Sequence, residues 1–266
     1  MRPPIAPVTT ALPQNWLGLA LVLLASCLIS QRAQAGERED FLSGKSKSCQ
    51  NCDLAEVSFK RRDLSGADLT GANLKNANFH DARLIGAKLD GAQLDGANLN
   101  KSDLSRASLR KANLSEAMLY GAKLDGASLE GADLSKAMMG AVRATRVDFS
   151  KATLTQADLR KARLADSQFE QAQLDGAALD FAFARGAHFT KASLQGTRLI
   201  NTELMESTFS AANLSGADLY GAKLRDAKLD QATLTASNLR KADLTGVKIE
   251  EAILDKTIMP DGSQLP

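Results

Sequence analysis

Two cysteines that are three positions apart, Cys49 and Cys52, are the strongest candidates for chemistry in this sequence. A redox-active Cys-x-x-Cys motif normally needs a helix N-terminus to lower the pKa of one thiol, and a metal site needs further Cys or His ligands. The sequence around the motif has neither a thioredoxin-like alternation of strands and helices nor such ligands. We therefore predict a structural disulfide between Cys49 and Cys52. Buried thiols are the alternative, and redox or metal chemistry is the remaining one.

Other residue types that serve in catalysis are scattered. His80 and His188 are the only histidines, and the repeat described below places them on opposite sides, so neither can be combined with a nucleophile and an acid. Asp68, Asp133 and Asp218 each precede a leucine, and we interpret them as corner-forming residues and not as paired catalytic acids. The sequence therefore predicts no enzyme, no catalytic residue, no cofactor and no metal.

A large apolar residue at every fifth position is the dominant pattern. From Leu54 to Leu254 there are 41 pentads without an insertion; the central residue is Leu in 31 of them, and the residue two positions earlier is Ala in 29. Five residues of an α-helix would carry each leucine roughly 140° around the axis, and five residues of a strand would reverse its face. Short extended pieces joined by polar, Gly-containing corners fit the pattern. The chain therefore winds around its own leucines as a solenoid.

The spacing of the phenylalanines predicts the length of one turn. Four of them are 20 residues apart: Phe149, Phe169, Phe189 and Phe209. Twenty residues are four pentads, so we predict a four-sided coil in which these rings form one interior column. Ala144 and Ala184 each precede one of these phenylalanines in the central position, which is typical of volume compensation in a close-packed core.

The repeat resembles the pentapeptide-repeat family, whose pattern is roughly A-[DN]-L-x-x. Five segments match it directly: Ala67-Asp68-Leu69, Ala72-Asn73-Leu74, Ala97-Asn98-Leu99, Ala132-Asp133-Leu134 and Ala217-Asp218-Leu219. The resemblance covers residues 52–254 and implies an all-β fold, a right-handed quadrilateral β-helix of about ten four-sided coils. The handedness follows from the resemblance alone.

The N-terminus has the pattern of a secretory signal. Residues 17–30 form an apolar run of 14 residues, which is short for a membrane-spanning helix, and the run is followed by Ala33-Gln34-Ala35. We predict a signal peptide over residues 1–35 that is cleaved after Ala35. An uncleaved N-terminal anchor and lipid anchoring through Cys27 are the alternatives.

Capping segments are expected at both ends of the repeat, because a solenoid leaves unpaired backbone there. We predict an N-terminal cap over residues 36–51, which includes the Cys-x-x-Cys motif, and a C-terminal cap over residues 255–266, which contains a Pro-Asp-Gly turn signal. After removal of the signal the chain is then a single domain. Both flanks resemble those of exported cyanobacterial members of the family, which implies the periplasm or the thylakoid lumen.

One surface region departs from the regular pattern. Phe181 and Phe183 occupy positions that should face outward, and basic residues lie on the same corner of the coil: Arg143, Lys161, Arg163 and Arg185. Aromatic residues mixed with arginine are typical of the core of a protein interface, so this region is a candidate interaction patch. In the alternative, Phe183 turns inward to fill the space left by Ala184.

Charge and shape favour a non-enzymatic structural or protein-interaction scaffold. Removal of residues 1–35 deletes two of the 33 basic residues, so 31 basic residues balance 31 acidic ones, and no field draws nucleic acid to the chain. A flat-sided solenoid lacks the concave pocket of an enzyme. The expected partner is an unidentified protein or a second copy, with no integral membrane span in the mature chain. Some members of the family mimic B-form DNA and bind DNA gyrase, an alternative that the export signal and neutral charge disfavour.

Overall fold

The computed structural model describes residues 35–266 of the protein, in two units, Met1–Ser46 and Lys47–Pro266. In the first unit, residues 35–43 are helical, and the helix ends in a turn in which the backbone N–H of Lys45 donates to the carbonyl of Asp40 at 2.8 Å. The predicted signal peptide up to Gln34, including Cys27, lies outside the described residues. Within residues 35–266, no helix is long and apolar enough to cross a membrane.

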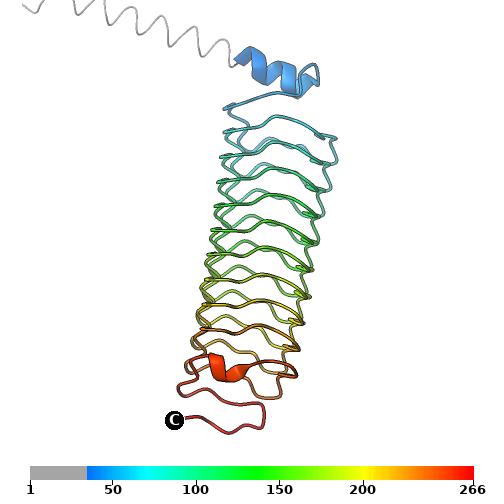
Figure 1. Ribbon diagram of the computed structural model, residues 1–266. Coiled ribbons are helices and arrows are strands. Elements are labelled where there is room, and N and C mark those ends of the chain that lie inside the picture. The colour runs from blue at the N-terminus through cyan, green and yellow to red at the C-terminus, as the bar shows by residue number, and fades with distance from the viewer. Residues whose placement is uncertain (1–34) are drawn as a thin grey trace, which may run out of the picture. The chain divides into compact units, whose positions relative to one another are not determined.

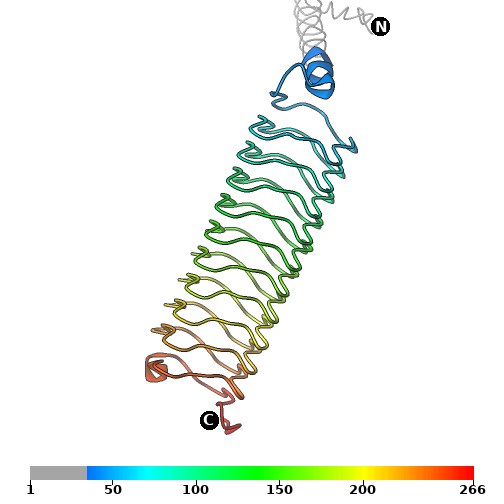
Figure 2. The same cartoon turned by 90° about the vertical axis from the view of Figure 1, so that its right-hand side faces the viewer.

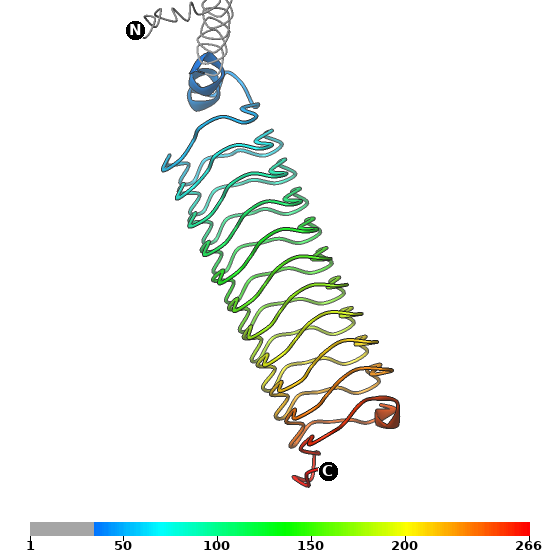
Figure 3. The ribbon, with the colours of Figure 1, turned by 90° about the vertical axis from the view of Figure 1, so that its left-hand side faces the viewer.

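The second unit is a β-helix whose turns are 20 residues long. Parallel bridges join each outward position to the residue 20 positions later, as in the series Asn73 to Gln93 to Asn113. Each bridge involves a single residue pair, so the pairing is a ladder of isolated bridges and not a set of long strands. Figures 1, 2 and 3 show the resulting coils stacked along one axis. Four pentads therefore make one turn.

Each pentad combines one extended piece with one corner. The N–H of Leu74 donates to the carbonyl of Gln93 in the next coil at 2.7 Å, and the N–H of Ala77 closes the corner on the carbonyl of Leu74 at 3.0 Å. The third residue of this turn, Asn76, has a φ of 54°. Glycine and asparagine are the residues that adopt a positive φ most readily, which explains why Gly recurs at this position of the repeat.

The interior is filled by the central residues and the alanines two positions before them. The rings of Phe149, Phe169, Phe189 and Phe209 stack in one column, with centroids 4.8 to 4.9 Å apart. The small side chains of Ala144 and Ala184 are fully buried beside this column. Where a hydroxyl replaces alanine it finds a carbonyl, as when Thr202 donates to Leu179 at 2.8 Å.

The ladder loses its regularity before the pentads end. A 3₁₀ helix, η1 (Ile249–Glu251), stands where the sequence repeat continues, and the expected bridge from Lys228 to Lys248 is missing among the described residues. Beyond η1 the tail turns back, and Ile258 pairs antiparallel with Gln264. Regular pentads up to Leu254 therefore did not predict this irregular last turn, where the core below is nearly finished and less apolar surface remains to bury.

Candidate functional site

The cysteine pair is chemically closed in the structure. The sulfur atoms of Cys49 and Cys52 are 2.06 Å apart in a disulfide, and the two residues are 0% and 1% exposed. The N–H of Cys49 donates to the carbonyl of Asp68 at 2.9 Å, so the bridge lies at the start of the ladder. A buried bond within the first coil has a structural role.

Aspartates of the repeat serve its corners. One carboxylate oxygen of Asp133 accepts from the backbone N–H of Ser135 at 2.9 Å and from its hydroxyl at 2.6 Å. Asp68 holds Thr70 in the same way, and Asp218 accepts from the N–H of Tyr220 at 3.1 Å. Residues 35–266 contain no cluster of three His, Cys, Asp or Glu residues that could hold a metal ion.

The two outward phenylalanines are exposed. Phe181 is 51% and Phe183 is 47% exposed, while Ala184 is fully buried without them. The inward alternative for Phe183 is therefore wrong, because a bridge position points its side chain away from the core. We call this surface the Phe corner, and it comprises six residues: Phe181, Phe183, Arg143, Lys161, Arg163 and Arg185.

Stacking brings the Phe corner together from three successive coils. Parallel bridges join Arg143 to Arg163 and Arg163 to Phe183. One column away, the turn residues Lys161 and Phe181 have φ values of 60° and 59°. Among the 27 described non-glycine residues with positive φ, Phe181 is the only aromatic one. A bulky side chain is unfavourable in this conformation, so the fold alone gives no reason for a phenylalanine here.

Positive charge remains uncompensated at the centre of the Phe corner. Arg143 pairs with Asp125 at 2.8 Å, and Arg185 pairs with Glu206. Lys161 and Arg163 form no ion pair with any residue that the structure describes. The corner therefore presents two exposed rings beside two free cations, an arrangement that suits an acidic and partly apolar protein surface.

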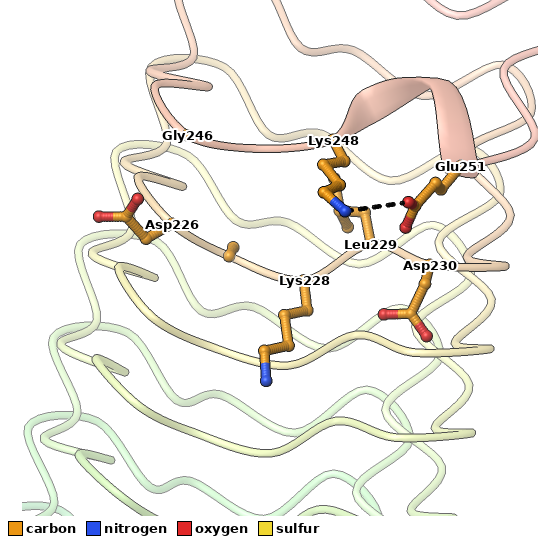
Figure 4. Close-up of a pocket in the computed structure, with 8 residues that line it drawn as sticks. Asp226, Lys228, Leu229, Asp230, Gly246, Lys248 and Glu251 are labelled. Carbon is orange, nitrogen blue, oxygen red and sulfur yellow. Dashed lines mark ion pairs between the residues drawn. The ribbon is translucent and has the colours of Figure 1, made fainter.

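A separate pocket of about 330 Å³ opens where η1 interrupts the ladder. Figure 4 shows Lys248 turned toward Glu251, and the two form an ion pair at 3.5 Å. Asp226, Lys228 and Asp230 also line it, so acids and bases are mixed and no pair of catalytic groups converges. The pocket is best explained as the space that the 3₁₀ turn leaves beside the last regular coil.

Sequence reasoning missed two features next to the Phe corner. Tyr120 and Met138 are 59% and 47% exposed on the adjoining side, and Gly140 stands one position before the corner site where glycine normally occurs. An aromatic residue and a misplaced glycine, 20 positions apart, were the available signal. Asp180 is buried and its carboxylate lies 3.2 Å from Arg198, and nothing in the repeat pattern marks it.

Family descriptions match most of the second unit. The description Pentapeptide repeats, in eight copies, matches residues 52–91, 87–126, 112–150 and 145–180. The description Pentapeptide repeat region matches residues 183–258. These matches together span more than half of the chain. A search of curated proteins gives no match.

Solved structures of such repeats are similar to the chain. HetL, a pentapeptide repeat protein involved in heterocyst differentiation regulation from the cyanobacterium Nostoc sp. strain PCC 7120, is 34% identical over 86% of this chain and 98% of that one, with a TM-score of 0.38. QnrB1, a plasmid-mediated fluoroquinolone resistance protein, is 21% identical over 63% of this chain and 89% of that one, with a TM-score of 0.51. A pentapeptide repeat protein from the Arabidopsis thaliana thylakoid lumen is 25% identical over 49% of this chain and 70% of that one, with a TM-score of 0.19. The fold of such proteins is a right-handed β-helix, to which the ladder of this chain conforms.

Proposed function

Because the chain belongs to the pentapeptide-repeat family, we propose that it is a non-enzymatic interaction scaffold that docks a protein partner on the Phe corner. The observation that carries this proposal is the pair of half-exposed rings of Phe181 and Phe183 beside the free cations of Lys161 and Arg163. Proteins of this family are generally structural or interaction proteins, and no catalytic family matches the chain.

Energetics support a role for the corner outside folding. A glycine would suit the positive φ of Phe181 better than a phenylalanine does, and Phe183 leaves about half of its surface in water. Exposed aromatic rings lose apolar surface to water when a partner covers them, at about 25 cal/mol per Å². Both residues therefore gain more free energy in a complex than they contribute to the fold.

The setting that we propose is an exported compartment. The predicted signal over residues 1–35, with cleavage after Ala35, would deliver the mature chain to the periplasm or the thylakoid lumen. There it would form about ten four-sided coils as one domain, with caps over residues 36–51 and 255–266. The oxidising conditions of such compartments suit the disulfide of Cys49 and Cys52.

Cross-linking in native cells tests the docking surface. A tagged full-length chain and its Phe181→Ser/Phe183→Ser variant are treated with a chemical cross-linker, and captured proteins are identified by mass spectrometry. Ile253→Ser is the matched control, because Ile253 is 50% exposed at an equivalent bridge position remote in sequence from the corner. We expect one partner to be captured by the native chain and the control and lost from the double variant. Equal capture by all three would refute the assignment of the site.

DNA mimicry with binding to gyrase is not favoured as a second function. A mimic needs strongly acidic faces, whereas residues 36–266 have a formal net charge of zero, from 31 basic and 31 acidic residues. We expect the purified protein to leave the supercoiling activity of DNA gyrase unchanged.

A further inference from the structure

Exposed apolar side chains of the described chain are concentrated in one area that extends beyond the Phe corner. Five large apolar residues are exposed, and four of them lie on two adjoining sides of the middle coils: Tyr120, Met138, Phe181 and Phe183. A parallel bridge joins Met118 to Met138, so these two methionines are neighbours on the side that carries Tyr120. Methionine side chains adapt their shape readily and are frequent at binding surfaces.

A notch interrupts this apolar side at Gly140. Successive coils place Tyr120, Gly140 and Arg160 in one column, with the N–H of Gly121 donating to the carbonyl of Gly140 and that of Ala141 to the carbonyl of Arg160. A Cβ atom at Gly140 would lie 3.2 Å from Cδ2 of Tyr120. The missing side chain leaves a pocket of about 300 Å³, lined by Tyr120, Gly140, Ala141, Asp158, Arg160 and Lys161.

The size and walls of the notch suit a single planar side chain. Its volume is at the lower limit of about 300–1,000 Å³ for small-molecule sites, which argues for one residue of a partner and against a cofactor. The ring of Tyr120 forms one wall, and the guanidinium of Arg160 belongs to the other. Aromatic rings stack on tyrosine and lie favourably against a guanidinium group.

Charge beside the notch determines which partner fits. Arg160 is neutralised by Asp158, through hydrogen bonds of 2.8 and 2.6 Å, and Asp180 is balanced by Arg198. Lys161 lines the notch and also belongs to the Phe corner, and Lys161 and Arg163 have no acidic partner among the described residues. The surface next to the aromatic slot is therefore positively charged.

We infer that the notch at Gly140 is the anchor site of the proposed docking surface, and that it binds one aromatic side chain from an acidic peptide segment of a partner protein. The inference deepens the proposed function and rests on it. The acidic residues of the segment reach Lys161 and Arg163, while its aromatic side chain enters between Tyr120 and Arg160. Electrostatic attraction speeds association, and the buried ring supplies most of the affinity.

Fluorescence anisotropy with labelled probe peptides tests this inference on the full-length chain. The probe is Asp-Glu-Trp-Glu-Asp; the comparison peptides replace its Trp by Ala or its four acids by Lys. We expect saturable binding of the probe that weakens as salt is added, and at least about tenfold weaker binding of both comparison peptides. The absence of saturable probe binding, or equal binding of the peptide without Trp, would overturn the inference.

Variants of the notch locate the binding. Gly140→Leu fills the slot without backbone strain, since Gly140 is not among the residues with positive φ, and we expect it to weaken probe binding about tenfold or more. Thr155→Leu is its control, because Thr155 occupies the same position of a pentad on another side. Thermal unfolding of each variant shows whether it is folded, and Gly140→Ala is a smaller change that should weaken binding less. Unchanged binding by folded Gly140→Leu would contradict the site.

Charge variants test the second half of the inference. We expect Lys161→Gln/Arg163→Gln to weaken binding and to flatten its salt dependence. Lys191→Gln is the control, because Lys191 also has a positive φ and forms no ion pair among the described residues. An unchanged salt dependence in the double variant would contradict the role of these cations.

The same Gly140→Leu variant separates the notch from the proposed function. If it captures the cellular partner at the native level while Phe181→Ser/Phe183→Ser does not, the notch is refuted and the docking corner stands. If sedimentation velocity shows dimers that Gly140→Leu abolishes, the occupant is a second copy of the chain and the peptide is refuted.

Discussion

Phe169 and Phe183 are the same residue type only 14 positions apart, yet they meet opposite environments. Phe169 is fully buried, with ring centroids of Phe149 and Phe189 at 4.9 and 4.8 Å. Phe183 is 47% exposed beside Arg163. The difference lies in register alone, since Phe169 occupies the central position of its pentad and Phe183 the position before it.

This contrast separates stability from function in a repeat of five. Central positions repeat the same inward geometry and are selected for volume, as the alanine next to each end of the Phe149–Phe189 segment illustrates. Outward positions are not constrained by packing, so an apolar side chain there calls for another explanation. The two classes of phenylalanine should therefore respond oppositely to substitution.

The largest effect is expected from Phe169→Ala, which breaks the interior side of the comparison. The change removes the middle of a stacked column and leaves a cavity, at a cost of about 3–5 kcal/mol in the free energy of unfolding. Urea unfolding followed by circular dichroism measures it. A loss below about 1 kcal/mol would mean that the column does not stabilise the coils.

A smaller effect is expected when the disulfide is removed. The Cys49→Ser/Cys52→Ser variant loses a cross-link that closes a very short loop, and we expect a loss of about 2 kcal/mol. The same unfolding experiment measures it, with reductant added to the native protein as the second arm. Free thiol titration of the unreduced native chain that finds both cysteines reactive would contradict the bond itself.

Acid should weaken the outer corner contacts before it affects the core. Hydrogen bonds from the Arg160 side chain hold the pKa of Asp158 below its ordinary value of 3.8. A lowered pKa contributes stability that is present above pH 3.8 and is lost as the pH falls through the folded-state value. We expect native protein to unfold at a higher temperature than Asp158→Asn at pH 7, and the difference to shrink below pH 3.8. A difference that does not change with pH would contradict this.

The smallest effect on folding is expected from Phe183→Ser, which tests the exterior side. An exposed side chain contributes little to stability, so the free energy of unfolding should change by no more than about 0.5 kcal/mol. The measurement is again urea unfolding, beside Phe169→Ala. A loss as large as that of Phe169→Ala would show that Phe183 packs into the fold.

The sequence alone predicted the interior of this molecule well, because one rule of five residues repeats. The 20-residue turn followed from the spacing of Phe149 to Phe209, and the inward register of Cys49 followed from counting. The 3₁₀ turn of η1 did not follow, since its pentads look regular and the departure depends on how the last coil ends. The notch at Gly140 escaped notice because a glycine is common in the repeat and only its register is unusual.

The most direct test of the account places a photo-cross-linking amino acid, p-benzoylphenylalanine, at position 183 and, in a second chain, at position 253. Both positions are bridge positions with about half of the side chain exposed, so they differ in location and not in accessibility. We predict one specific cross-linked partner at position 183 in native cells and none at position 253. The same products from both positions, or none from position 183, would contradict the claim that the Phe corner is the docking surface.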